Sequence, residues 1–138
     1  MIEKLKKKIL FLCTGNVARS QMAEALANAF HGDVVEAVSA GSRPGGGIHP
    51  LAVRALAEKG IDAAGAPSKN ASEFLDKPFD VVVTVCDSAA QDCPLWPGAK
   101  RLEHWPIVDP SYGGLPRFIE IRDELEGRID ALVATLSA

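Results

Sequence analysis

The sequence has few cysteines, little excess charge and no long apolar run, and each of these absences excludes a class of protein. Its 138 residues contain three cysteines, an odd number that argues against a secreted disulfide scaffold. The formal net charge is -3 at pH 7, which gives no reason to expect nucleic acid or an anionic membrane as a partner. No apolar stretch approaches the length that spans a bilayer.

The amino-terminal segment does not have the pattern of a secretion signal. A small basic run over residues 4–8 precedes an apolar stretch that is too short for a signal peptide and stops at Cys13. No linker, internal repeat or low-complexity tract follows. We therefore expect one domain over residues 1–138, located in the cytoplasm and monomeric.

The stretch from residue 9 to residue 25 combines a strand, a polar turn and a helix. Residues 9–12 are apolar, as in a strand buried within a parallel sheet. Ser20 is a suitable N-cap for an Ala- and Leu-rich helix that runs to Phe30. Residues 13–19 should thus form a loop where unpaired N–H groups and a positive helix dipole make an anion site.

This loop carries groups that suit nucleophilic chemistry. Helix N-termini and nearby cations favour the thiolate form of a cysteine, here Cys13. Arg19 supplies a cation whose planar fork can grip two oxygens of a tetrahedral oxyanion. The Ser20 hydroxyl group could donate a hydrogen bond to the thiolate. The alternative is a buried cysteine before an ordinary strand–helix turn.

The rest of the chain alternates strands and helices. We expect strands over residues 34–39, 79–85 and 99–103, helices over residues 51–59 and 115–136, and one or two helical turns over residues 71–76. This order predicts an α/β fold, an open doubly wound parallel sheet of about four strands, flavodoxin-like, with helices on both faces. Cys13 and Cys86 each follow a predicted strand, so they could face one crevice at the carboxyl ends of the strands.

Cys86 and Cys93 are separated by six residues that are compatible with a helix. Seven residues at ~1.5 Å rise would place their Cα atoms roughly 10 Å apart, whereas a disulfide needs about 4.4–6.8 Å. The two thiols could then pair only if the segment unwinds, as a redox shuttle would require. They could instead be two ordinary cysteines. A zinc site that adds Cys13 and His104 is disfavoured because no CxxC pair is present, and we expect no metal.

Asp109 lies in a loop before the last helix, where its carboxyl group could protonate a departing oxygen above the anion site. The alternative is an ordinary Asp-Pro turn. Trp96 and Trp105 suit packing better than chemistry.

Residues 13–20, C-T-G-N-V-A-R-S, resemble the phosphate-binding loop of the low-molecular-weight protein tyrosine phosphatases and of the arsenate reductases that share their fold. Gln21 stands where the phosphatases usually carry proline. The pattern V-V-T-V-C-x6-C-P, which contains Cys86 and Cys93, is similar to the reductases that use thioredoxin. The resemblance implies that the oxyanion is held by the whole loop, Cys13, Thr14, Gly15, Asn16, Val17, Ala18, Arg19 and Ser20.

The resemblance implies reduction of arsenate by a relay of three thiols. The Cys13 thiolate attacks arsenate, Asp109 supplies the proton, and a transient Cys13–Cys86 disulfide forms as arsenite leaves. Cys93 then attacks Cys86, and thioredoxin reduces the Cys86–Cys93 disulfide. Phosphate or sulfate would compete with arsenate. Two alternatives remain: a phosphatase that hydrolyses phosphotyrosine through a Cys13 phosphoenzyme, and a non-catalytic oxyanion or redox sensor.

The chain departs from the family at two positions. Many members carry a further cysteine where Ala18 stands, so a disulfide within the loop is impossible here. Some reductases bind potassium through residues matching Asn16, Glu24 and Ser39 together with an aspartate near the position of Lys69. We expect no tightly bound cofactor, and either a monovalent cation at this place or the Lys69 ammonium group instead of it.

Overall fold

The computed structural model describes residues 5–85 and 99–136, and within these ranges it contains a four-stranded parallel sheet. In chain order the elements are β1 (Lys7–Cys13), α1 (Arg19–His31), β2 (Val35–Gly41), α2 (Pro50–Ala57), the 3-10 helix η1 (Ala71–Phe74), β3 (Val81–Val85), β4 (Leu102–Trp105) and α3 (Gly114–Leu136). The strand order is β2-β1-β3-β4, so β1 lies inside the sheet and its carboxyl end is flanked by neighbours on both sides.

Strand β1 is buried on both faces because its last five residues are all apolar. Ile9 and Phe11 join the larger core cluster, which also contains the buried residues of the α-helices. Leu10 and Leu12 face the other side of the sheet and pack in a smaller cluster with Ala71 of η1. Alternation along the strand thus divides one apolar run between two cores.

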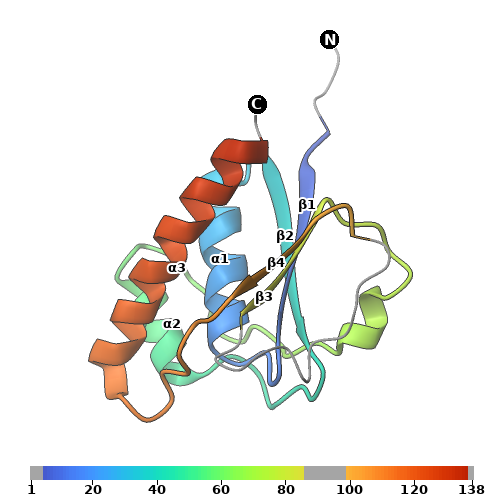
Figure 1. Ribbon diagram of the computed structural model, residues 1–138. Helices are drawn as coiled ribbons and strands as arrows, with labels where there is room; N and C mark the ends of the chain where they lie inside the picture. The colour runs from blue at the N-terminus through green and yellow to red at the C-terminus, as the bar shows by residue number, and fades with distance from the viewer. Residues whose placement is uncertain (1–4, 86–98, 137–138) are drawn as a thin grey trace.

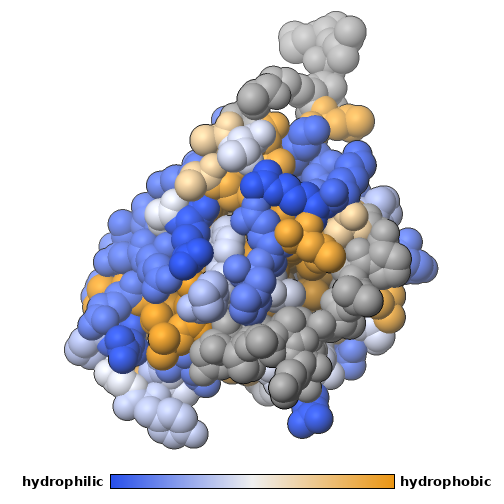
Figure 2. All heavy atoms as spheres, viewed as in Figure 1, coloured by the Kyte–Doolittle hydropathy of each residue, from blue (hydrophilic) through white to orange (hydrophobic). Residues whose placement is uncertain are grey.

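The helices α1, α2 and α3 cover one face of the sheet, and η1 lies on the opposite side (Figure 1). Helix α3 buries an apolar stripe at spacings of three and four, and the members of this stripe are Phe118, Ile121, Leu125, Ile129 and Leu132. In Figure 2, hydrophilic residues cover much of the α3 side of the molecule, with hydrophobic residues between them. Within the described residues no helix is long and apolar enough to cross a membrane.

The predicted fold class, an open parallel α/β sheet, is confirmed. Two local predictions are corrected. Helix α1 begins at Arg19 with Ala18 at the N-cap position and no side-chain cap, because the Ser20 hydroxyl group bonds to the loop instead. The fourth strand is Leu102–Trp105, and Ala99 makes only an isolated bridge to Phe79.

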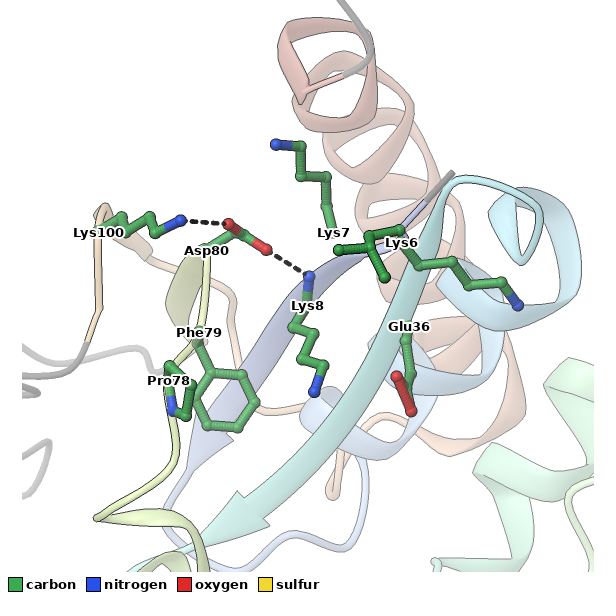
Figure 3. Close-up of a pocket in the computed structure, with 9 residues that line it drawn as sticks. Lys6, Lys7, Lys8, Glu36, Pro78, Phe79, Asp80 and Lys100 are labelled. Carbon is green, nitrogen blue, oxygen red and sulfur yellow. Dashed lines mark hydrogen bonds and ion pairs between the residues drawn. The ribbon is translucent and has the colours of Figure 1, made fainter. Parts of the chain in front are cut away.

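Several lysines and two acidic residues, Glu36 and Asp80, line a pocket at the amino ends of the strands (Figure 3). Asp80 accepts a hydrogen bond from the Lys8 N–H group at 2.8 Å and pairs with the Lys100 Nζ atom at 3.4 Å. Burial raises the pKa of this carboxyl group. The Lys8 hydrogen bond and the interactions with Lys100 lower the pKa by more than burial raises it, so the pKa lies below the ordinary value of 3.8. The loop that follows β1 lies at the other end of the sheet.

Candidate functional site

Cys13 ends β1 and is 6% exposed, so its sulfur lies within the loop rather than on the surface. Its Sγ atom accepts a hydrogen bond from the Asn16 N–H group at 3.2 Å and lies 2.8 Å from the Ser20 Oγ atom. Asn16 lies in the turn that follows the strand, and Ser20 lies in the first turn of α1. The predicted contact between Ser20 and the Cys13 sulfur is therefore observed.

The loop carbonyl groups that follow Cys13 are all bonded from outside the loop. The pairs are Arg43 N–H to Thr14 O at 2.9 Å, Gly45 N–H to Gly15 O at 2.9 Å, Ser68 O–H to Asn16 O at 2.8 Å and His49 N–H to Val17 O at 2.7 Å. The segment over residues 43–49 therefore runs along the outer side of the loop. Gly41, at the end of β2, approaches the loop so closely that a Cβ atom there would lie 2.4 Å from the Thr14 carbonyl oxygen.

Outward carbonyl groups turn the loop amides inward. In a planar trans peptide unit the C=O bond and the following N–H bond point in opposite directions. The N–H groups of residues 15–18 are therefore directed away from the outer segment, and the Asn16 N–H group reaches the Cys13 sulfur in this way. Successive inward N–H groups before a helix N-terminus form an anion-binding site.

Asn16 fixes this arrangement from a fully buried position. Its φ angle is 53°, a left-handed conformation that asparagine adopts more readily than most residues. Its side-chain N–H groups donate to Ser20 Oγ and to Ser39 Oγ, both at 2.9 Å, and its Oδ1 atom accepts from the Lys69 N–H group at 2.8 Å. Because Ser20 Oγ accepts from Asn16, the Ser20 proton is free to be donated to the Cys13 sulfur. A thiolate is the form of cysteine that accepts such a bond best.

Arg19 and Asp109 lie close to each other beside the loop. The Arg19 Nη1 atom donates to the Ile107 carbonyl oxygen at 2.9 Å, and its Nη2 atom lies 4.0 Å from Asp109 Oδ2. The other carboxylate oxygen, Oδ1, accepts from the Ser111 N–H and O–H groups at 3.0 and 2.7 Å. Burial raises the pKa of Asp109, but the Ser111 bonds and the charges of Arg19 and His49 outweigh it and hold the pKa below 3.8.

A second polar cluster lies behind Asn16. Ser39 donates its O–H group to Glu24 Oε1 at 2.7 Å, and the Lys69 Nζ atom lies 3.4 Å from the same oxygen. The four residues that the sequence links to a cation site are therefore assembled in one place. The Ser39 proton is donated to Glu24, so Ser39 accepts from Asn16. The hydrogen bonds therefore run outward from the Asn16 amide in two directions, through Ser20 to the Cys13 sulfur and through Ser39 to Glu24.

The sequence did not reveal the outer segment over residues 43–49, the central position of Asn16 or the contact of Ser111 with Asp109. A Gly-rich segment signals a close approach of two backbones, but not which backbone is approached. His104 is exposed, and its Nδ1 atom lies 2.6 Å from Thr84 Oγ1. Trp105 packs against Phe11, as expected. Cys86, Cys93 and Trp96 lie outside the described residues.

Comparison with known proteins agrees with this geometry. Residues 8–138 match the family of low molecular weight phosphotyrosine protein phosphatases. An arsenate reductase of Brevibacillus brevis is 39% identical over 130 residues, covering 94% of this chain and 96% of the relative. An arsenate reductase of Halalkalibacterium halodurans is 40% identical over 136 residues, covering 94% and 97%.

Solved structures give the same picture. A structure described as an arsenate reductase in the phosphate binding state has a TM-score of 0.85 at 31% identity, covering 94% of this chain and 98% of that chain. The thioredoxin-dependent arsenate reductase of Corynebacterium glutamicum has a TM-score of 0.79 at 31% identity, covering 99% of this chain and 64% of that chain. The fold, the loop and the sequence matches together place this chain in the low molecular weight phosphotyrosine protein phosphatase family.

Proposed function

We propose that this protein reduces arsenate to arsenite and that Cys13 is the nucleophile. The observation that carries the proposal is the Cys13 sulfur, which receives donors from Asn16 and Ser20 inside a loop whose amides face inward. A tetrahedral oxyanion fits such a loop, and phosphate and arsenate share this shape and charge. The relatives of this chain that are named arsenate reductases support arsenate as the substrate.

In the first step, the Cys13 thiolate attacks arsenic while the loop amides and Arg19 bind the oxyanion. A sulfur–arsenic bond forms and an arsenic–oxygen bond breaks. Asp109 gives its proton to the departing oxygen, which leaves as water. Arg19 is poised for this step because the Ile107 carbonyl group and Asp109 already hold its guanidinium group beside the loop.

In the second step, Cys86 attacks the Cys13 sulfur. The sulfur–arsenic electron pair passes to arsenic, which leaves as arsenite, and a Cys13–Cys86 disulfide remains. Cys93 then attacks Cys86 and releases the Cys13 thiolate, and thioredoxin reduces the Cys86–Cys93 disulfide. Two electrons from two thiols balance the reduction of arsenic. The spacing of the two cysteines and the thioredoxin-dependent neighbour support this relay.

A single-turnover experiment without thioredoxin tests the proposal. The fully reduced protein is mixed with excess arsenate, and arsenite and free thiols are counted. One arsenite per chain and a fall from three free thiols to one are expected. Cys13→Ser should release no arsenite. Full thiol retention with no arsenite from the wild type would contradict the proposal.

The family itself favours a second candidate, hydrolysis of phosphotyrosine through a Cys13 phosphoenzyme. This candidate predicts that Cys86→Ser and Cys93→Ser hydrolyse an aryl phosphate as fast as the wild type, and that arsenate produces no arsenite. A non-catalytic sensor would bind the oxyanion and oxidise without turnover. Some phosphatase activity is compatible with arsenate reduction, so arsenite formation is what separates these functions.

We also propose that the Lys69 ammonium group occupies the place of a monovalent cation. Its Nζ atom lies 3.4 Å from Glu24 Oε1 and 3.4 Å from the Pro67 carbonyl oxygen, so one positive charge already faces the oxygens that a cation would need. Potassium chloride should then leave the melting temperature and activity of the wild type unchanged relative to choline chloride, and should raise both in Lys69→Asp. A large potassium effect on the wild type would contradict the proposal. Cytoplasmic location, a single domain and a monomeric state stay predictions.

A further inference from the structure

The two oxygens of the Asp109 carboxylate have different surroundings. Oδ1 accepts both hydrogen bonds from Ser111, at 3.0 Å from its N–H group and 2.7 Å from its O–H group. Oδ2 faces Arg19 Nη2 at 4.0 Å. One oxygen is therefore held by the protein loop, and the other faces the group that binds the oxyanion.

The loop is built to keep this orientation. Pro110 is buried, and its ring restricts the backbone φ angle between Asp109 and Ser111. The Pro110 carbonyl group accepts a hydrogen bond from the Gly113 N–H group at 3.0 Å. The hydrogen bond from the Ser111 N–H group to the Asp109 side chain closes an Asx-turn, a local structure that aspartate favours. The Ser111 O–H group adds a second donor, which a side chain without a hydroxyl group would not supply.

We propose that Ser111 is a positioning residue that directs Oδ2 of Asp109, as the oxygen that carries the proton, towards the departing oxygen of the substrate. This inference rests on the proposed function, in which Asp109 is the acid. With two donors on Oδ1, a proton on that oxygen would displace one of them, whereas a proton on Oδ2 leaves both bonds intact. The proton is thus held on the Arg19 side, above the loop that contains Cys13.

The charges around Asp109 link its protonation to substrate binding. Arg19 at the start of α1 and His49 before α2 are the charged or titratable side chains that lower its pKa, together with the Ser111 bonds and against burial. An oxyanion bound to Arg19 adds negative charge beside Oδ2 and raises the pKa of Asp109. Binding of the oxyanion therefore shifts Asp109 towards the protonated form that the acid role requires, whereas the Ser111 bonds oppose this shift.

Four variants test this inference in the single-turnover assay, with the rate of arsenite release measured from acid to alkaline pH. We expect Ser111→Ala to lower the saturating rate about tenfold because a slightly misplaced acid loses much of its effect. The half-saturating arsenate concentration should change less than about twofold, since the loop itself is intact. The alkaline limb of the rate profile should move to higher pH, because one bond that favours the carboxylate is lost. Ser111→Thr keeps the hydroxyl group and should restore both the rate and the profile.

A double-mutant cycle separates this role from a structural one. If Ser111 acts through Asp109, Ser111→Ala should have no further effect in the Asp109→Asn background. An equal loss in both backgrounds would overturn the inference, and so would an unchanged rate and pH profile in Ser111→Ala. Full activity in Asp109→Asn would instead refute the acid role in the proposed function, so the two failures give different results.

Discussion

Replacing Asn16 by alanine should destabilise the loop more than any other single change within it. The substitution removes the donors to Ser20 and Ser39 and the acceptor for the Lys69 N–H group. It also leaves a β-carbon with no hydrogen-bonding group at a φ angle of 53° in a fully buried position. Three separate costs thus fall on one residue.

Their sizes follow from the contacts. The Lys69 N–H group loses its side-chain acceptor, which costs roughly 1–3 kcal/mol if no water replaces it. Each of the two lost serine bonds is worth about 0.5–1.5 kcal/mol, because both hydroxyl groups keep the bonds that they donate. The left-handed backbone costs alanine about 1 kcal/mol. We therefore expect the free energy of unfolding to fall by roughly 3–7 kcal/mol, against a total of about 5–15 kcal/mol for a typical domain.

Urea denaturation of the reduced protein measures this change, with Asn16→Gly as the matched control. Glycine loses the same hydrogen bonds but adopts the left-handed conformation freely, so this variant should be more stable than Asn16→Ala by about 1 kcal/mol. Both variants should lose most oxyanion affinity because Ser20 is no longer oriented. A loss below about 1 kcal/mol in Asn16→Ala, or an alanine variant more stable than the glycine variant, would refute the reasoning.

Three further predictions concern other parts of the chain. Gly41→Ala places a Cβ atom 2.4 Å from the Thr14 carbonyl oxygen, so phosphate binding measured by calorimetry should weaken at least about tenfold; unchanged binding would mean that the loop does not depend on this approach. Asp80→Asn should lower the free energy of unfolding at neutral pH. The difference from the wild type should vanish as the pH falls through the lowered folded-state pKa, below 3.8, because Asp80 is then protonated in both the folded and the unfolded state. A difference that persists at about pH 2 would contradict this. Arg122→Met removes a buried guanidinium group that donates to the Ala55 carbonyl oxygen at 2.8 Å. We expect urea denaturation to show a loss of about 2 kcal/mol in the free energy of unfolding, and no more, because the acidic partners of Arg122 are half exposed and contribute little. A neutral effect would show that the packing of α2 and α3 does not need this contact.

The sequence predicts the frame of the site because the frame depends on local patterns. A short apolar run, a polar turn and an Ala-rich stretch place Cys13 between a strand and a helix, and the structure has this order. Asp109 follows from its position in the loop before the last helix, and it does lie beside Arg19. These predictions need only periodicity, turn residues and the rule that parallel strands share one binding edge.

The remaining features depend on contacts between residues far apart in sequence. Ser20 is a residue type that often caps helices, yet here its hydroxyl group accepts from the Asn16 amide and bonds to the Cys13 sulfur instead. The outer segment over residues 43–49 contacts the loop through backbone groups, which every residue carries, so its Gly-rich composition does not identify the loop as its partner. Tertiary hydrogen bonding decided these cases, and local propensity could not reveal it.

The most direct test of the central claim is arsenate-dependent oxidation of NADPH in the presence of thioredoxin and thioredoxin reductase. The wild type should turn over many times, whereas Cys86→Ser and Cys93→Ser should not, since each breaks the relay at one thiol. Melting temperatures close to that of the wild type would show that both variants are folded. Multiple turnovers in either variant, or an inactive wild type that hydrolyses an aryl phosphate as fast as both variants, would contradict the three-thiol mechanism.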